Sequence, residues 1–401
     1  MSSKVVIFLK QSTPALIGSY DPTLVDKVFY IRPSSIKGIW RWFARALIAG
    51  ALYDLGYLQA IPHNGLWRIS KPRGEIEPIS YFVGKIMGLG YVDPRGQKNE
   101  SSRFFMRIDV VKPPRISRVH GRSIHVEGRQ VLLQRLSLLS LGRGRSTIEY
   151  FENGKFKLTL TRVRSHNRDC EELALRSLIL ALSLSGIGKG ARKGLGSLDI
   201  VNVRGIQVES DFSQFLERTY DLAKKVVEAH VGMLELRHIK VPDLPPLSLF
   251  SKRTCCNMPL SAIYVLSNVS WISIHNFFLR SERCKVLYGN YRKPDNLRKK
   301  FEAWILGLPR SQRGTGYIMK EGERRASPIF VVNHNDDHIF RGGVYLTVFL
   351  SCDWPLRLEW KGDTSSREIN IDINTIVSAM SDALNELWRY LKICPPRPIW
   401  P

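Results

Sequence analysis

Hydrophobic residues follow two different spacings along the chain, and these spacings predict a mixture of strands and helices. The first residues, Val5 to Leu9, form a continuous apolar run that is typical of a buried strand. Residues 34–52 instead repeat large apolar side chains at helical spacing, and Ser34 or Ser35 can cap the first turn. The apolar face of this helix contains Ile36, Trp40, Phe43 and Leu47. The chain therefore opens with a strand and an amphipathic helix.

The rest of the N-terminal half contains more strand signals than helix signals. Residues 60–168 mix Gly, Pro and Arg with short alternating stretches at 104–111 and 156–163, which indicates a strand-rich insertion ending in hairpin strands. Residues 170–185 return to a helical pattern, and residues 198–203 form an apolar strand pattern. The order strand, helix, strand, strand, helix, strand is that of a ferredoxin-like unit.

The C-terminal half repeats this order in part. A helical pattern at 212–236 is followed by 241–246, which contains three prolines and favours an extended linker. The elements predicted beyond it are a strand at 262–274, a helix at 294–306, strands at 329–332 and 344–349, and a helix at 373–391. They form a second series whose sixth element has no clear pattern.

The length and composition agree with two folded cores. A chain of 401 residues with 44% hydrophobic residues is long enough for two domains of about 100 to 200 residues. We expect an α+β protein with two ferredoxin-like domains, which have the RRM-like arrangement, and an insertion in the first. The predicted boundaries are an N-terminal domain at 1–210, a helix and Pro-rich linker at 211–260, and a C-terminal domain at 261–401.

The charge of the chain favours a polyanionic partner. The sequence has 60 Lys and Arg against 36 Asp and Glu, a formal charge of +24 that fold stability does not require. Residues 1–205 carry 33 of the basic residues and only 15 of the acidic ones, so the N-terminal half is the expected anion-binding half. Nucleic acid is preferred over a membrane surface, because no apolar run reaches the roughly 18 residues of a membrane helix.

The location and redox chemistry follow from simpler patterns. Residues 5–9 are too short for a secretory signal, which needs about 7 to 15 apolar residues, so we expect a cytoplasmic protein. The six cysteines contain no C-x-x-C pair, which indicates reduced thiols rather than disulfides or structural zinc. We therefore expect no metal and no cofactor.

A basic stripe marks the helix at 34–52. Lys37, Arg41 and Arg45 recur every four residues, and Arg32 precedes them. A cation in the first helical turn opposes the helix dipole by about 0.3 to 1 kcal/mol, and a phosphate bound at that end would reverse the sign. These four residues are predicted to bind RNA. The alternative is a solvated basic face with no ligand.

A glycine-rich run between the second helix and the following strand is the second predicted RNA-binding element. Glycines allow backbone amides to converge on phosphate oxygens, while nearby cations neutralise the charge. Neither the spacing of a P-loop nor that of a dinucleotide fingerprint occurs, and the run follows a helix rather than a strand, which favours a polymer backbone. A flexible turn is the alternative. The predicted residues are Gly186, Gly188, Lys189, Gly190, Arg192, Lys193, Gly194, Gly196 and Ser197.

Signals for catalysis are weaker than signals for binding. His120 and His125 are candidates for acid–base cleavage of RNA, and Asp21 or Asp26 for a metal-dependent cut, but ordinary structural roles are favoured for each. His334 and His338 have spacing compatible with metal ligation, but the asparagines beside them favour a polar turn. Arginines are dense between 103 and 145, and this density, rather than any single arginine, favours RNA binding. They are Arg103, Arg107, Arg115, Arg118, Arg122, Arg129, Arg135, Arg143 and Arg145.

Several segments together resemble the RAMP proteins of CRISPR effectors. They are Thr13–Gly18 after the first strand, Arg32–Leu47 opening as R-P-S-S-I-K-G, and Gly188–Ser197 ending as R-K-G-L-G-S. The later Gly307–Pro309 and Arg324–Ile329 make the chain similar to the two-domain RAMP subunit of the type III-B Cmr complex. That subunit consists of two fused ferredoxin-like halves.

The resemblance implies a non-catalytic subunit that holds the 3′ region of the guide RNA and the end of the guide–target duplex. Its expected partners are guide RNA, target RNA and other RAMP subunits, and its expected role is antiviral defence. By the same resemblance, the basic stripe and the glycine-rich run hold RNA, while Arg324 and Arg325 support a turn or an interface. Two alternatives are a metal-independent RNA-processing endonuclease of the same superfamily and a general RNA chaperone.

Overall fold

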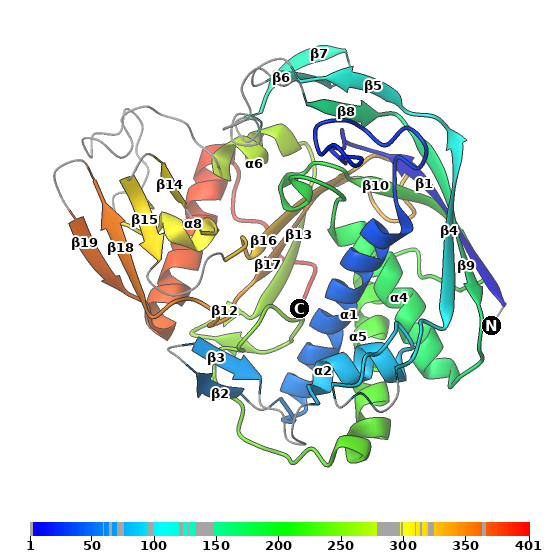
Figure 1. Ribbon diagram of the computed structural model, residues 1–401. Coiled ribbons are helices and arrows are strands. Elements are labelled where there is room, and N and C mark those ends of the chain that lie inside the picture. The colour runs from blue at the N-terminus through cyan, green and yellow to red at the C-terminus, as the bar shows by residue number, and fades with distance from the viewer. Residues whose placement is uncertain are drawn as a thin grey trace.

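The computed structural model gives an α+β protein in which the strands paired within the described residues are all antiparallel. Two lobes, one around α1 and the other around α8, lie side by side (Figure 1). The described residues are 3–58, 60–63, 66–69, 76–94, 96, 99–119, 123–126, 128–133, 136, 148–278, 297, 300–308, 310–312, 315–319, 325–362 and 366–401. Among them, every helix is too short or too polar to cross a lipid bilayer.

The N-terminal lobe is built on a four-stranded sheet with the order β10-β1-β9-β4. Its strands are β1 (Lys4–Gln11), β4 (Phe104–Lys112), β9 (Lys155–Arg162) and β10 (Leu198–Arg204). In β1, Val5, Ile7 and Leu9 are buried, while the residues between them are more exposed. This alternation shows that the apolar run at the start of the chain has one core face and one outer face.

Two helices, α1 (Pro33–Asp54) and α4 (Arg168–Leu184), cover the core face of this sheet, and a third, α5 (Phe212–His230), packs on both of them. Figure 1 shows all three on one side of the sheet. Asn167 caps α4 and Asp211 caps α5 through their side chains. The predicted serine cap of α1 is wrong, because the helix begins at Pro33 and its N-cap residue Arg32 makes no capping side-chain bond.

The C-terminal lobe repeats the same connections. Its sheet has the order β13-β17-β16, with β13 (Ser261–Leu266), β16 (Ile329–His334) and β17 (Gly343–Phe349), and α8 (Ile373–Leu391) follows β17. The element that the sequence pattern left unplaced is the chain end. There the N–H of Ile399 donates to the carbonyl of Ile263 at 2.8 Å, and Trp400 accepts from the N–H of Ile263 at 3.2 Å.

Two predicted elements of this lobe need correction. The strand predicted at 262–274 ends at Leu266, because α6 (Trp271–Phe278) begins soon afterwards. Of the helix predicted at 294–306, the described part contains a short 3-10 turn, Ala303–Leu306, and Leu297 in helical conformation. The prolines at 241–246 form no helix or strand, as predicted, but Val241 and Leu244 are buried, so this connection packs against the body.

Small sheets are inserted into both lobes. Residues 60–168 are rich in strands, as predicted, but the stretches at 104–111 and 156–163 belong to the main sheet as β4 and β9. The second lobe has an additional sheet with the order β14-β15-β18-β19. The pairs in the first lobe are β2 (Ala60–His63) with β3 (Leu66–Ile69), β5 (Arg115–Arg118) with β8 (Glu149–Glu152), and β6 (Ser123–Val126) with β7 (Arg129–Leu132). The inserted strands of the second lobe are β14 (Arg310–Gln312), β15 (Thr315–Met319), β18 (Arg357–Lys361) and β19 (Ser366–Asn370). Of these described pairs, only β2–β3 and β14–β15 occupy corresponding places in the two lobes, before the second strand of each main sheet. The remaining short elements are α2 (Pro78–Tyr81), a π turn (Phe82–Ile86), 3-10 turns (Ala191–Lys193 and Val231–Leu234), β11 (Thr254–Cys255) and β12 (Met258–Pro259).

The two lobes share one hydrophobic core. The ring of Trp42 in α1 lies 4.8 Å from that of Phe330 in β16, and Phe212 of α5 lies 4.7 Å from Phe340. At Gly50 a Cβ would lie 1.6 Å from the carbonyl oxygen of Phe250, so the connection between the lobes touches the α1 backbone directly. These contacts hold the lobes as one packed unit.

One carboxyl group under α8 makes stability depend on pH. Burial is the main cause that raises the pKa of Glu302 to about 7, and the neighbouring Asp382 carboxyl group adds to the effect. Because this pKa lies above the unfolded value, the stability that the protonated group contributes is present at low pH and is lost as pH rises toward 7.

We therefore expect Glu302→Gln to gain thermal stability relative to the unsubstituted protein between about pH 5 and pH 8. Glutamine stays neutral throughout this range. The gain should be below about 1 kcal/mol, since the carboxyl is only half-buried. Melting temperatures of both proteins across this range test it, and a difference that does not change with pH contradicts it.

Candidate nucleic-acid interface

The glycine-rich run lies where the two lobes meet. It leaves α4, makes one 3-10 turn at Ala191–Lys193 and enters β10. Gly188, Gly190, Gly194 and Gly196 all have positive φ, between 70° and 84°. A Cβ at Gly186 would lie 2.1 Å from the carbonyl oxygen of Leu195. The run therefore folds tightly onto itself, and its glycines have a packing reason that requires no phosphate.

Two of its three cations contact the C-terminal lobe. The Nζ atom of Lys193 donates to Ser327 Oγ at 2.7 Å and lies 3.3 Å from the ring centre of Phe278. The Arg192 guanidinium donates to the Ser327 carbonyl at 3.1 Å and lies 4.4 Å from the ring centre of Phe330. These contacts tie the turn to the start of β16.

The RNA contact predicted for this run stays a prediction, but only part of the run is exposed. Lys193 is only 5% exposed, and the buried residues around it face protein rather than solvent. These buried residues are Gly186, Lys193, Gly194, Gly196 and Ser197. Lys193 and Ser197 among them contact residues of the C-terminal lobe. Gly188, Lys189, Gly190 and Arg192 keep part of their surface open, and Lys189 Nζ donates to the Pro22 carbonyl at 2.5 Å.

The basic stripe on α1 is partly used to hold neighbouring loops. Arg41 donates to the Leu89 carbonyl at 3.1 Å through Nε and at 2.5 Å through Nη2. Arg45 donates to Ser80 Oγ at 2.6 Å and lies 3.3 Å from Glu77. Both side chains therefore position residues 77–89, which follow the β2–β3 hairpin.

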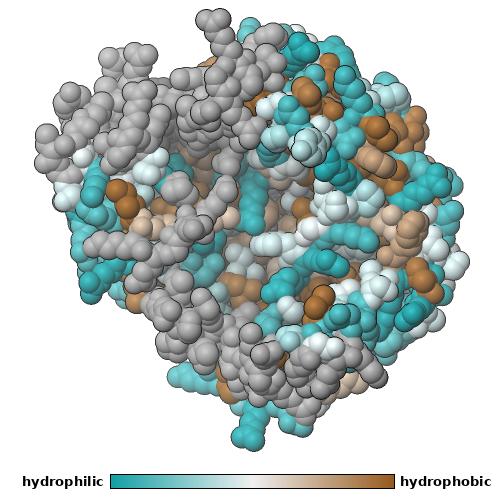
Figure 2. Space-filling view, in the orientation of Figure 1, coloured by the Kyte–Doolittle hydropathy of each residue, from teal (hydrophilic) through white to brown (hydrophobic). Residues whose placement is uncertain are grey.

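The other two cations of the stripe differ from each other. Arg32 pairs with Asp26 at 3.1 Å and donates to the Gly18 carbonyl at 3.2 Å, which closes the loop after β1. Lys37 makes no hydrogen bond or ion pair within the described residues and stays half-exposed. Figure 2 shows the surface hollowed between the two lobes, with polar side chains gathered over the elements around α1. Lys37 is thus the stripe residue most available to an anion.

The aspartates proposed for a metal-dependent cut shape this loop instead. Asp21 accepts from the backbone N–H of Thr23 at 2.7 Å. Backbone N–H groups, that of Phe29 foremost, and the Arg32 guanidinium lower the pKa of Asp26. Both carboxylates therefore have structural partners.

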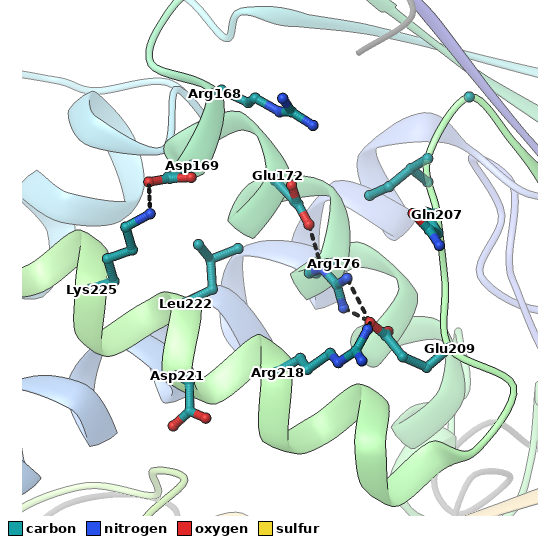
Figure 3. A pocket seen from close by; sticks show the side chains of 12 residues that line it. Arg168, Asp169, Glu172, Arg176, Gln207, Glu209, Arg218, Asp221, Leu222 and Lys225 are labelled. Carbon is teal, nitrogen blue, oxygen red and sulfur yellow. Dashed lines mark hydrogen bonds and ion pairs between the residues drawn. The ribbon is translucent and has the colours of Figure 1, made fainter.

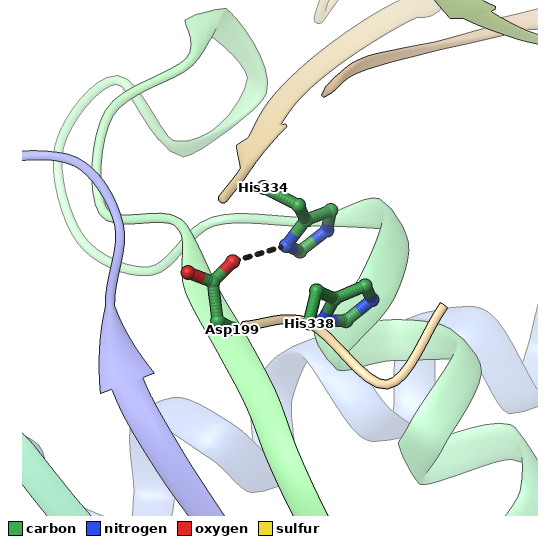
Figure 4. Close-up of side chains that lie close together, drawn as sticks. All are labelled: Asp199, His334 and His338. Carbon is green, nitrogen blue, oxygen red and sulfur yellow. Dashed lines mark hydrogen bonds and ion pairs between the residues drawn. The ribbon is translucent and has the colours of Figure 1, made fainter. Parts of the chain in front are cut away.

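The histidine candidates fall into two groups. His120 lies outside the described residues, as do Arg122, Arg135, Arg143, Arg145 and Arg324. His125 lies in β6, where its backbone N–H donates to the Tyr150 hydroxyl at 2.9 Å. His334 and His338 join Asp199 of β10 in a buried cluster between the lobes (Figure 4). The sequence spacing found the two histidines but not the aspartate.

This cluster is arranged as a hydrogen-bonded junction. His334 Nδ1 lies 2.9 Å from Asp199 Oδ1 and its Nε2 lies 2.8 Å from the Ser183 carbonyl, so both ring nitrogens face oxygen acceptors. The His338 ring stacks on His334 at 3.8 Å, and its Nδ1 accepts from the Ile200 N–H. Burial is the main cause that holds the pKa of His338 well below its ordinary value, and the neighbouring His334 adds to the effect.

A second polar site lies between α4 and α5 and was not found from the sequence. A cavity of about 610 Å³ is lined there by charged side chains of both signs (Figure 3). Arg176 is its buried centre, and it pairs with Glu209 at 2.8 Å and with Glu172 at 3.0 Å. Burial alone would raise the pKa of Glu209, but bonds from Arg176 and Arg218 hold it below its ordinary value. Most of the charged side chains that line this cavity therefore form ion pairs with one another.

Comparisons with known proteins agree with this architecture. Residues 9–199 match the model of the RAMP superfamily, whereas no curated protein matches. A chain in the cryo-EM structure of the Type III-B Cmr-beta bound to cognate target RNA is 15% identical, with a TM-score of 0.52, and the match covers 96% of this chain and 99% of that one. The crystal structure of apo Cmr1 from Pyrococcus furiosus is 18% identical, with a TM-score of 0.49 and coverage of 99% and 98%. The first of these similarities shows a shared fold, and residues 9–199 are similar to the RAMP superfamily.

Proposed function

We propose that this chain is a non-catalytic RNA-binding subunit of a type III-B Cmr ribonucleoprotein. In that complex it would hold the 3′ region of the guide RNA and the end of the guide–target duplex, next to other RAMP subunits. The observation that carries the proposal is the RAMP match of residues 9–199, together with a fold shared over nearly the whole chain with a component of an RNA-bound Cmr complex.

Topology and charge support the same proposal. The order β10-β1-β9-β4, and the order in which Trp400, β13, β17 and β16 lie side by side, are both consistent with ferredoxin-like domains. The formal charge of +24 suits a partner rich in phosphates. Asp21, Asp26 and His334 are engaged in structural contacts, which favours binding without cleavage.

Lys37 gives the sharpest test of the predicted stripe. We expect Lys37→Glu to weaken binding of single-stranded RNA about 2- to 10-fold and to reduce the log–log salt slope by about 0.7, the value for one phosphate contact. Arg41 and Arg45 are less suitable, because their substitution would also release Leu89 and Glu77. Fluorescence anisotropy at several salt concentrations measures both quantities.

The control for this test is Lys240→Glu, which changes the same charge at an exposed position. Equal losses in the two variants would mean that only net charge matters, and the stripe would not be a site. Incubation of the protein with labelled RNA, with and without divalent metal, tests the second part of the proposal. A site-specific product without metal would favour the endonuclease alternative.

A further inference from the structure

We propose that the outer face of the N-terminal sheet is a stacking platform for a single-stranded RNA segment, on which bases pack against Phe8 and Phe105. This inference rests on the proposed function, because it assigns the RNA a second surface on the same lobe. The platform is defined by Phe8 on β1, Phe105 and Arg107 on β4, Lys155 and Lys157 on β9, and Arg204 on β10.

The strand register places these side chains on one face. Phe8 pairs directly with Lys157 of β9, and Val6, two residues earlier, pairs with Arg204 of β10. Residues directly opposite each other on neighbouring strands project to the same side of a sheet. The intervening residues of β1 are buried in the core, so this side is the outer one. Figure 1 shows the described helices on the opposite side of the sheet.

Apolar surface is exposed on this face, because the described helices lie on the other side of the sheet. Phe105 is 61% exposed and Val111, farther along the same strand, is 58% exposed. Phe8 borders a hollow of about 370 Å³ whose walls include Lys10, Lys155, Val201 and Arg204. Such hollows are within the size range of small-ligand sites, and exposed aromatic surface commonly marks an interaction site.

The charges of the platform are complementary to a phosphate chain. The Arg204 guanidinium lies 5.2 Å from the ring centre of Phe8, and neither Arg204 nor Lys157 has a carboxylate partner in the described part of the chain. Arg107 pairs with Asp109 at 2.6 Å, and Lys10 pairs with Asp337. Positive charge therefore exceeds negative charge around the two aromatic rings.

This combination favours unpaired RNA over a duplex. Bases in a duplex stack on one another and expose mainly backbone, whereas single strands present base faces that can pack on aromatic rings. In RRM domains, a four-stranded sheet with exposed aromatic residues binds two or three bases in this way. Phe8 lies opposite Lys157 of β9, and Phe105 of β4 lies opposite Thr161, four residues farther along β9, so the two rings are separate stacking positions on one face.

The test uses the full chain and a fluorescein-labelled single-stranded RNA of mixed sequence that forms no hairpin. We expect Phe8→Ala with Phe105→Ala to weaken binding at least about fivefold per ring, because each lost stacking contact removes that much affinity. The log–log salt slope should stay unchanged, since no cation is removed. Phe8→Trp should bind as well as the unsubstituted protein. Ultraviolet crosslinks should map to peptides of β1 and β4.

The matched control is Tyr390→Ala on α8, another aromatic side chain that is 41% exposed. Melting temperatures of all variants establish that they are folded. If the unsubstituted protein binds RNA and the double variant binds equally well, the platform is refuted while the proposed function stands. If the unsubstituted protein binds no RNA, the proposed function itself fails. Equal affinity for a duplex of the same sequence also refutes the platform, and leaves this face to a protein partner.

Discussion

Replacing Gly196 by alanine should lower the free energy of unfolding by about 3 to 5 kcal/mol. Gly196 has φ of 70°, which costs an L-residue about 1 kcal/mol or more. The added Cβ would also lie 2.0 Å from the carbonyl oxygen of Ile187, which is backbone and cannot rotate away. Relief requires a shift of the chain and would break the bonds that Gly196 makes with Ile187 and Pro14, both 2.9 Å long. Urea unfolding followed by circular dichroism measures the loss.

Gly38→Ala is the matched control for this prediction. Gly38 lies within α1, and nothing lies within 4 Å of the Cβ that alanine would add. Alanine at such a helical position should stabilise the protein by about 0.5 to 1 kcal/mol. If the two substitutions change the free energy of unfolding by similar amounts, tight packing does not explain the glycines of this run. Phosphate binding would then be the better explanation.

The glycine-rich run shows why its role could not be predicted from local sequence. Glycines next to cations suit a phosphate cradle and also suit a turn packed against another lobe, because both need positive φ and close approach. The contacts that distinguish the two come from Ser327 and Phe330, more than 130 residues away along the chain. No periodicity in the run itself carries this information.

The helices of the first lobe were predicted well because their signals are local. The spacing of Trp40 and Phe43 places both on the buried face of α1, as observed. The opposite stripe was predicted only in part. Its positions are correct, but Arg41 and Arg45 meet a carbonyl and a carboxylate on a segment that starts more than 30 residues later. Sequence spacing locates a side chain on a helix and does not show which loop covers it.

The outer face of the N-terminal sheet was missed for a different reason. Phe8 stands inside the apolar run from Val5 to Leu9, which reads as a strand buried on both faces. The structure covers only one face with helices, so Phe8 becomes part of a surface. The available signal was the alternation of β9, where Lys155 and Lys157 flank the buried Phe156.

The charged site between α4 and α5 leads to the second large expected effect. Arg176→Met should lower the free energy of unfolding at neutral pH by about 3 kcal/mol, the cost of leaving a buried charge with too few partners. The Arg176 side chain is 6% exposed and binds both oxygens of Glu209, at 2.8 and 3.0 Å. Glu209 would still form its ion pair with Arg218. The expected loss of stability therefore lies at the lower end of the range for breaking a buried ion pair. Denaturant unfolding at about pH 7 provides the measurement.

Arg218→Ala separates the buried pair from the exposed one. Arg218 bonds to the same carboxylate at 3.0 Å, but its side chain is 67% exposed, so its loss should cost no more than about 1 kcal/mol.

Because Arg176 lowers the pKa of Glu209, the stability from the Arg176–Glu209 pair is present at neutral pH and is lost as pH falls through the folded pKa of Glu209. The gap between Arg176→Met and the unsubstituted protein should therefore narrow on acidification, and adding Glu209→Gln should restore much of the stability. Equal losses for Arg176→Met and Arg218→Ala, or a gap that widens in acid, would show that the buried pair does not hold α4 to the chain beyond β10.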